Sequence, residues 1–201
     1  MRPHSRCFDR FKERLLPEEC SAVKGWLNNI SHEIIRDFQI DGSVPHGRTF
    51  QQIEAFERHF SSALAKAVVC KETVFRGLSA GGCFFDAGTG SMNFLRCLID
   101  GPEEIIFPSH ASASLSEEIG RGHCHIDPED QPRRLSVLLR IQPRTARYLA
   151  PYTHKPKDEE EVVILKGTPY RRTNRRRLPD PKPGLEYWEV ELVEEGGDSI
   201  A

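Results

Sequence analysis

Two glutamates, Glu159 and Glu161, directly precede an apolar run from Val162 to Leu165. The run has the length and composition of a buried strand, and residues two apart on a strand point to the same face. The entrance of this strand therefore presents two parallel carboxylates, which repel each other and are seldom kept for stability alone. Such a pair is suited to stabilising a positive charge or taking up a proton. Taken alone, the pattern also fits a solvated acidic loop.

Further polar residues precede this pair along the chain. Arg76 and Gly77 stand in the segment VFRGL, and Ser112 stands in SHASASLSEE. An arginine guanidinium matches phosphate oxygens and keeps its charge, and a glycine allows close approach to the backbone. An arginine that ends an edge strand is common, so Arg76 alone does not indicate a site. The order of the three segments is more informative than any one of them.

The order Arg, then Ser-x-Ser, then Glu-x-Glu before VVILKGT resembles the mono-ADP-ribosyltransferases of the Arg-Ser-Glu class, which include bacterial toxin and type III effector domains. The most specific match runs from Val137 to Arg172, and residues 16–38 resemble the N-terminal helix of that family. The resemblance covers nearly the whole chain. It implies an α+β fold in which helices precede a split pair of mixed sheets around a cleft for NAD.

The resemblance implies roles toward NAD for the two upstream segments. Arg76 would grip the pyrophosphate, and the backbone at Gly77 would hold the nicotinamide amide. Ser112 and Ser114 match the two serines of the Ser-x-Ser element at the NAD site, where Ser112 would orient the catalytic glutamate. Ser114 also begins the pattern Ser-Leu-Ser-Glu, which fits a capping box, and we favour a role at the start of a helix for it.

The two glutamates would carry the reaction itself. Glu161 matches the family's catalytic glutamate, which holds the ribose 2′-hydroxyl and stabilises the oxocarbenium-like transition state. Glu159 matches the glutamate that accompanies arginine as acceptor and deprotonates its guanidinium. The implied activity transfers ADP-ribose from NAD to an arginine side chain of a protein target and releases nicotinamide. NAD is expected as a substrate, and no metal is expected.

Three departures from the family pattern keep other functions open. Phe75 replaces a tyrosine, His110 replaces an aromatic residue, and residues 117–130 lack the Phe, Tyr or Trp that packs on nicotinamide in the family. Arg121 or a histidine could take that place. One alternative is a degenerate, NAD-inactive domain whose cleft binds a peptide or protein partner. Another is hydrolysis of NAD without a protein acceptor.

The remaining sequence predicts the elements that position these residues. Residues 1–67 predict helices, because apolar residues recur at three- and four-residue spacing over 23–38 and over 50–67. Short apolar or alternating runs over 68–193 predict strands, and residues 194–201 form a Gly- and acid-rich tail that is expected to fray. Helices followed by strands favour one α+β domain in a chain of 201 residues.

Two other clusters invite a different kind of site. His123, Cys124 and His125 are adjacent, and neighbours on a strand diverge, so they do not suit a single metal ion. Five arginines between Arg171 and Arg177 could contact RNA or an acidic partner. Interleaved aromatic residues for stacking on single strands are missing. We favour a solvated hairpin between the final strands and expect no nucleic-acid partner.

The overall composition indicates a globular protein without a net electrostatic attraction to polyanions. A net charge of −2 gives no overall attraction to nucleic acid or to a membrane. No apolar run approaches the roughly 18 residues of a membrane-spanning helix, and the first residues lack the apolar core of a typical secretory signal. The six cysteines form no CxxC pair and are expected as free thiols. With the resemblance, these features indicate a translocated effector that acts in a host cytosol.

Overall fold

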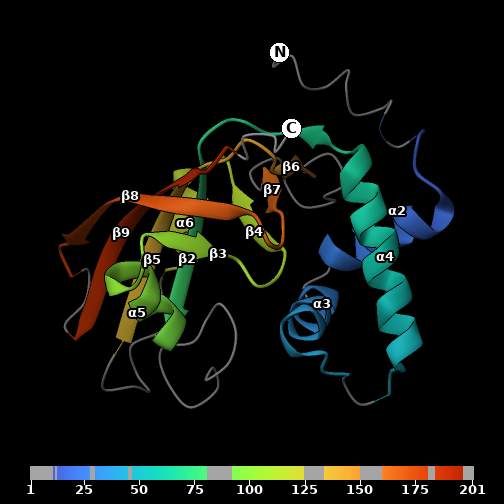
Figure 1. The fold of residues 1–201 in the computed structure, drawn as a ribbon, viewed down its shortest axis with the longest axis horizontal. Helices are drawn as coiled ribbons and strands as arrows, with labels where there is room; N and C mark the ends of the chain where they lie inside the picture. Colours follow the sequence, from blue (N-terminus) through green and yellow to red (C-terminus); the bar gives the residue numbers. More distant parts are fainter. Residues whose placement is uncertain are drawn as a thin grey trace.

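The computed structural model describes residues 11, 13–27, 30–44, 47–80, 92–124, 134–149, 160–180 and 184–196. Within these ranges, three helices precede the strands, α2 (Pro17–Leu27), α3 (Ile30–Asp41) and α4 (Phe50–Lys66), and two shorter helices, α5 (Met92–Asp100) and α6 (Glu117–Gly122), lie between strands. The strands are β1 (Val68–Val69), β2 (Val74–Ala80), β3 (Glu104–Ile106), β4 (Ala111–Ser114), β5 (Arg134–Gln142), β6 (Arg147–Tyr148), β7 (Glu161–Ile164), β8 (Pro169–Leu178) and β9 (Leu185–Glu194). The α+β class predicted from the sequence is confirmed (Figure 1).

The first three helices follow the predicted apolar spacing, with one difference. The stretch 23–38 is divided, because α2 ends at Leu27 and α3 begins at Ile30. Helix α4 begins with a capping box, in which Thr49 Oγ1 accepts from Gln52 N (3.2 Å) and Gln52 Oε1 accepts from Thr49 N (2.9 Å).

The described strands form one nine-stranded mixed sheet in the order β1-β6-β7-β4-β2-β5-β9-β8-β3. Strands β5 and β9 run parallel, and the other neighbours run antiparallel. Strand β2 pairs with β5 along its whole length, but it meets β4 at the single pair Phe75↔Ser114. A single residue pair therefore joins the β1-β6-β7-β4 part of the sheet to the β2-β5-β9-β8-β3 part. The helices and this large mixed sheet confirm the α+β fold that the family resemblance implies.

Two apolar cores enclose strand β7. Val162 belongs to the larger core with α5, whereas Val163 belongs to a second core with Trp26 of α2 and Phe60 of α4. Adjacent residues of a strand point to opposite faces, so β7 is buried on both. This double burial explains why its sequence is continuously apolar rather than alternating. Figure 1 shows α2, α3 and α4 gathered on one side of the molecule, beside the β6–β7–β4 half of the sheet.

The arginine run lies in β8 itself, one arm of the hairpin with β9, and not in a turn. Two of its members bind the C-terminal end of α5, where carbonyls lack helical partners and positive charge is favourable. Arg172 donates to the carbonyls of Cys97 (3.3 Å), Leu98 (2.8 Å) and Gly101 (2.7 Å), and Arg175 donates to the Ile99 carbonyl and to Asp100 (2.6 Å). The other three pair with carboxylates, as Arg171–Glu195, Arg176–Glu189 and Arg177–Asp180. The run is thus engaged within the fold.

The last strand extends to the first residue of the predicted tail. Glu194, expected to begin the tail, is the last residue of β9 and is buried. Its carboxylate accepts hydrogen bonds from the backbone nitrogens of Arg144 (2.5 Å) and Thr145 (3.0 Å). Residues 197–201 lie outside the described part of the chain.

Four cysteines in the described ranges are free thiols, namely Cys20, Cys70, Cys97 and Cys124. Cys7 and Cys83 lie outside those ranges. None of the helices in the same ranges has the length and apolar character needed to cross a bilayer.

Candidate active site

Ser112 and Glu161 meet across neighbouring strands. Strand β4 pairs antiparallel with β7, with Ser114 opposite Glu161 and Ser112 opposite Val163. Ser112 and Glu161 are therefore diagonal neighbours on one face of the sheet. Ser112 Oγ donates a hydrogen bond of 2.8 Å to Glu161 Oε1. The structure thus brings together the serine and the glutamate that the family resemblance links.

A second donor to the same carboxylate comes from the helices. Trp26 Nε1 donates to Glu161 Oε1 at 3.0 Å, although the two residues are 135 positions apart in the sequence. The indole is 1% exposed and stacks on Phe60, with ring centroids 4.4 Å apart and 17° between the planes. The sequence predicts Trp26 only as part of an apolar helix face. Only its residue type indicated a polar contact as well, because a buried tryptophan usually finds an acceptor for its N–H.

Arg76 crosses the junction between the two halves of the sheet. It stands on β2, and its Nη1 donates to the carbonyl oxygen of Ser112 on β4. Burial, and after it the positive charge of Arg36 on α3, lower the pKa of Arg76 to about 10, although the negative charge of Glu161 acts in the opposite direction. Its Nε is buried and has no partner among the described residues. Arg36 is already paired with Asp37 at 2.9 Å, so the unsatisfied Nε of Arg76 is the group that a bound anion would stabilise.

Gly77 is required for a reason different from the expected one. An added Cβ would lie 2.1 Å from the carbonyl oxygen of Gly120 and 2.8 Å from the nitrogen of Cys124, both in or just after α6. The close approach that needs a glycine is therefore that of α6 onto β2. The implied contact between the Gly77 backbone and nicotinamide remains a prediction.

Ser114 is not the helix start that the sequence favours. It pairs with Glu161 as the last residue of β4, and helix α6 begins at Glu117 with Ser116 as its N-cap. Ser116 Oγ accepts from Ile119 N (3.4 Å), while Ser114 Oγ accepts from Ser116 N (3.0 Å). Strand pairing holds Ser114 in the sheet and so overrides the local capping pattern. The predicted contact of Ser114 with NAD remains a prediction.

His110 replaces the expected aromatic residue and packs as one. It is 8% exposed, and its ring is edge-on to those of Trp26 (6.4 Å) and Phe60 (5.8 Å). Burial lowers the pKa of His110 to about 4, so the ring is neutral at physiological pH. Its Nδ1 accepts from Lys166 N at 3.0 Å, directly after β7. The substitution therefore preserves the packing behind Trp26.

Several predicted positions lie partly or wholly outside the described residues. Glu159 falls in the segment 150–159, and His125 falls in 125–133. Arg121, which could replace the missing aromatic residue, donates to Glu117 Oε1 (2.8 Å) and to the hydroxyl of Tyr187 (3.1 Å). It is therefore engaged on α6 and β9. The described ranges contain no group of three or more His, Cys, Asp or Glu residues that could hold a metal ion.

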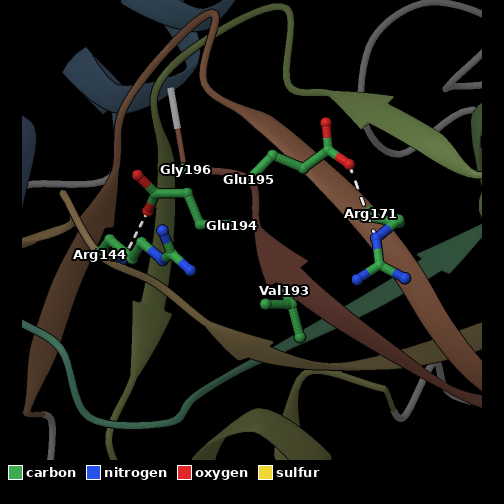
Figure 2. Close-up of a pocket in the computed structure, with 6 residues that line it drawn as sticks. All are labelled: Arg144, Arg171, Val193, Glu194, Glu195 and Gly196. Carbon is green, nitrogen blue, oxygen red and sulfur yellow. Dashed lines mark hydrogen bonds and ion pairs between the residues drawn. The ribbon is translucent and has the colours of Figure 1, made fainter. Parts of the chain in front are cut away.

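A cavity of about 340 Å³ lies elsewhere, at the ends of β8 and β9 (Figure 2). Two ion or hydrogen-bond pairs lie in its lining, Arg171 Nε with Glu195 Oε1 at 3.6 Å and the backbone nitrogen of Arg144 with Glu194 Oε2 at 2.5 Å. It shares no residue with the group around Glu161. We therefore place the candidate active site at the junction of β2, β4 and β7, under α2.

Solved structures with this fold were found by comparison, while no family model and no curated protein matches the sequence. The Vis toxin, an ADP-ribosyltransferase from Vibrio splendidus, has a TM-score of 0.67 at 16% identity over 94% of this chain and 78% of that chain. Vis has also been solved in complex with agmatine. The C. perfringens toxin BECa, solved with NADH, has a TM-score of 0.65 at 15% identity, over 94% of this chain and 46% of that one. The Clostridium limosum C3 exoenzyme has a TM-score of 0.60 at 14% identity, over 95% of this chain and 90% of that chain. The chain has the fold of the bacterial ADP-ribosyltransferase toxins.

Proposed function

We propose that this protein is a mono-ADP-ribosyltransferase that transfers ADP-ribose from NAD to an arginine side chain of a protein. The observation that carries the proposal is the convergence of Ser112 and Trp26 on one oxygen of Glu161, at the junction that Arg76 bridges. A carboxylate held by two donors beside a guanidinium suits a reaction that creates positive charge next to a pyrophosphate. The fold supports the same class of reaction.

In this reaction the bond between ribose C1′ and the nicotinamide nitrogen breaks, and its electron pair leaves with neutral nicotinamide. Glu161, held by Ser112, stabilises the positive charge that develops on the ribose. Arg76 and Arg36 supply positive charge for the pyrophosphate. A guanidinium nitrogen of the acceptor then bonds to C1′ and loses its proton to Glu159.

Arginine as the acceptor rests on two supports. Glu159 stands two residues before Glu161, the spacing of the Glu-x-Glu turn. The Vis toxin, which shares this fold, has been solved with agmatine, a small molecule that carries the guanidinium of arginine. A guanidinium has a high pKa, so a nearby carboxylate that takes up its proton is chemically suited to making it a nucleophile.

The test is nicotinamide release from NAD by the wild-type protein and by Glu161→Gln, with and without agmatine. We expect release that requires Glu161 and increases with agmatine. Glu159→Gln should keep slow release but lose the increase with agmatine. Glu160→Gln is the matched control, because it removes the neighbouring carboxylate and should leave release unchanged. Release by Glu161→Gln at the wild-type rate would contradict the assignment of the reaction to Glu161.

A binding module on the same fold is the second candidate. The described part of the segment expected to pack on nicotinamide, 117–124, contains no Phe, Tyr or Trp, and Arg121 is engaged by Glu117 and Tyr187. This candidate predicts no nicotinamide release and no increase of the melting temperature with NAD. Release that depends on Glu161 excludes it.

For either function we infer a protein target in a host cytosol. The toxin fold and the free thiols of the described cysteines support this inference. Incubation of the protein with labelled NAD and a eukaryotic cell lysate should label discrete host proteins. Labelling that is equally strong and diffuse in a bacterial lysate would argue against a host target.

A further inference from the structure

We infer that Trp26 is a positioning residue for Glu161, so that helix α2 is part of the reaction site and not only a cover for the sheet. This inference rests on the proposed function, because it gives Trp26 a part in turnover by Glu161. It adds to the expected set a residue from the helical segment that neither the motifs nor the resemblance identifies.

The two donors reach the carboxylate from different elements. Ser112 Oγ on β4 and Trp26 Nε1 on α2 both donate to Glu161 Oε1, at 2.8 Å and 3.0 Å. A carboxylate oxygen can accept more than one hydrogen bond, and hydrogen bonds to a charged acceptor are the stronger ones. Two donors on different elements fix the position of this oxygen more closely than one donor does. Removal of either should therefore loosen the same group.

The indole itself is rigidly held. It stacks on Phe60 at 4.4 Å and meets the edge of His110 at 6.4 Å, and it is 1% exposed. Because packing already fixes the ring, little conformational entropy is lost when its N–H binds the carboxylate. This preorganisation is what a positioning group needs.

The chain contains a matched control. Its second tryptophan, Trp188, also donates to a glutamate, with Nε1 at 2.7 Å from Glu186 Oε1. Glu186 is half-buried on β9 and is held by Arg96 at 2.6 Å. Trp188→Phe and Trp26→Phe therefore make the same chemical change, the loss of an indole N–H bound to a glutamate. Only one of the two glutamates belongs to the candidate site.

The first measurement compares kcat and KM for nicotinamide release, the dissociation constant for NAD and the melting temperature of both variants. For Trp26→Phe we expect kcat to fall about tenfold, because a hydrogen bond to a charged group is lost while phenylalanine keeps the stacking on Phe60. The dissociation constant for NAD should stay within about twofold. Trp188→Phe should match the wild type in kcat, in KM and in the dissociation constant for NAD. A merely structural role would lower the melting temperature without lowering kcat of the folded protein.

The second measurement does not depend on turnover. In the Trp188→Phe background Trp26 is the sole tryptophan, so its fluorescence reports on its own N–H contact. Adding Glu161→Gln should change the emission maximum, whereas adding Glu160→Gln should not. An emission maximum unchanged by Glu161→Gln overturns the contact. If Trp26→Phe keeps the wild-type kcat while Glu161→Gln is inactive, the positioning role of Trp26 is overturned and the proposed function stands. No release by the wild-type protein overturns the proposed function and this role with it.

Discussion

Replacing Gly77 with alanine separates two reasons for a glycine next to Arg76. The family resemblance implies that this glycine lets a ligand reach the backbone, whereas the structure places α6 where a side chain would stand. An alanine Cβ would lie 2.1 Å from the Gly120 carbonyl oxygen and 2.8 Å from the Cys124 nitrogen. Both are backbone atoms, so no side-chain rotation relieves the contact. Helix α6 must move away from β2, or β2 must bend.

The size of the effect follows from this geometry. Ordinary contact of a Cβ begins at 3.4 Å, so the Gly120 carbonyl must retreat by roughly 1 Å or more. Overpacking of this kind costs about 1–3 kcal/mol and more where the backbone resists, and we expect about 3 kcal/mol. A chain of this length loses about 2–4 °C of melting temperature per kcal/mol, so Gly77→Ala should melt about 6–12 °C below the wild type.

The assay is thermal and urea unfolding of Gly77→Ala beside Gly122→Ala. Gly122 is in helix α6, the helix that packs on Gly77, and an added Cβ at Gly122 meets nothing within 4 Å. Alanine at Gly122 should leave stability unchanged or raise it slightly, because alanine favours helix. If Gly77→Ala melts like the wild type but binds NAD more weakly, the packing argument is refuted and the ligand explanation stands.

Three further effects follow from single contacts. Ser112→Ala removes a hydrogen bond to a carboxylate, so kcat for nicotinamide release should fall about 10- to 100-fold with little change in melting temperature. Burial lowers the pKa of His110 to about 4 in the folded state against 6.5 when unfolded, so the unfolded state binds more protons below pH 6.5. Stability should therefore be unaffected by His110 above that pH and lower by about 2–3 kcal/mol at pH 4.5, measured by urea unfolding. Arg172→Met removes the donor to three carbonyls at the end of α5 and should cost about 2 kcal/mol in the same assay.

Controls exist for the two stability effects. His110→Phe keeps the ring contacts without the titrating group, so its stability should fall less between pH 6.5 and pH 4.5; an equal fall would show that other groups cause it. Arg171→Met removes an exposed ion pair with Glu195 and should change stability by less than about 0.5 kcal/mol. If Arg172→Met is no more destabilising than Arg171→Met, the contacts at the end of α5 contribute nothing measurable.

The parts of the fold that depend on short-range pattern were predictable. The apolar spacing of α4 and the continuous run of β7 each reflect burial that is local to one element. The meeting of Ser112 with Glu161 follows from the ordered motifs, because the family resemblance supplies the pairing of β4 with β7 that spacing alone cannot. The capping pattern at Ser114 gave a wrong prediction, because local spacing does not show that pairing with Glu161 holds this residue in the strand.

The parts that depend on how elements pack together were not predictable. An amphipathic stripe places Trp26 in a core but does not say which strand it faces, and its acceptor is 135 residues away. The sequence likewise gives no sign that α6 approaches β2 at Gly77. Arg172 and Arg175 read as surface charge in β8, although they bind the end of α5. In each case the contacting group is distant in the sequence, so only the packing of the elements brings the two together.

His110 shows how a departure from a family pattern can be consistent with the same site. As a sequence feature it counts against NAD chemistry, because an aromatic residue is expected there. In the structure it is buried and neutral, edge-on to Trp26, and it binds Lys166 N just beyond β7. It therefore ties the end of β7 to the ring whose N–H holds Glu161 at the start of the same strand. A phenylalanine would supply the packing but not the acceptor for Lys166 N. The substitution thus adds a fixed point to the site, and it is not by itself an argument that the site has been lost.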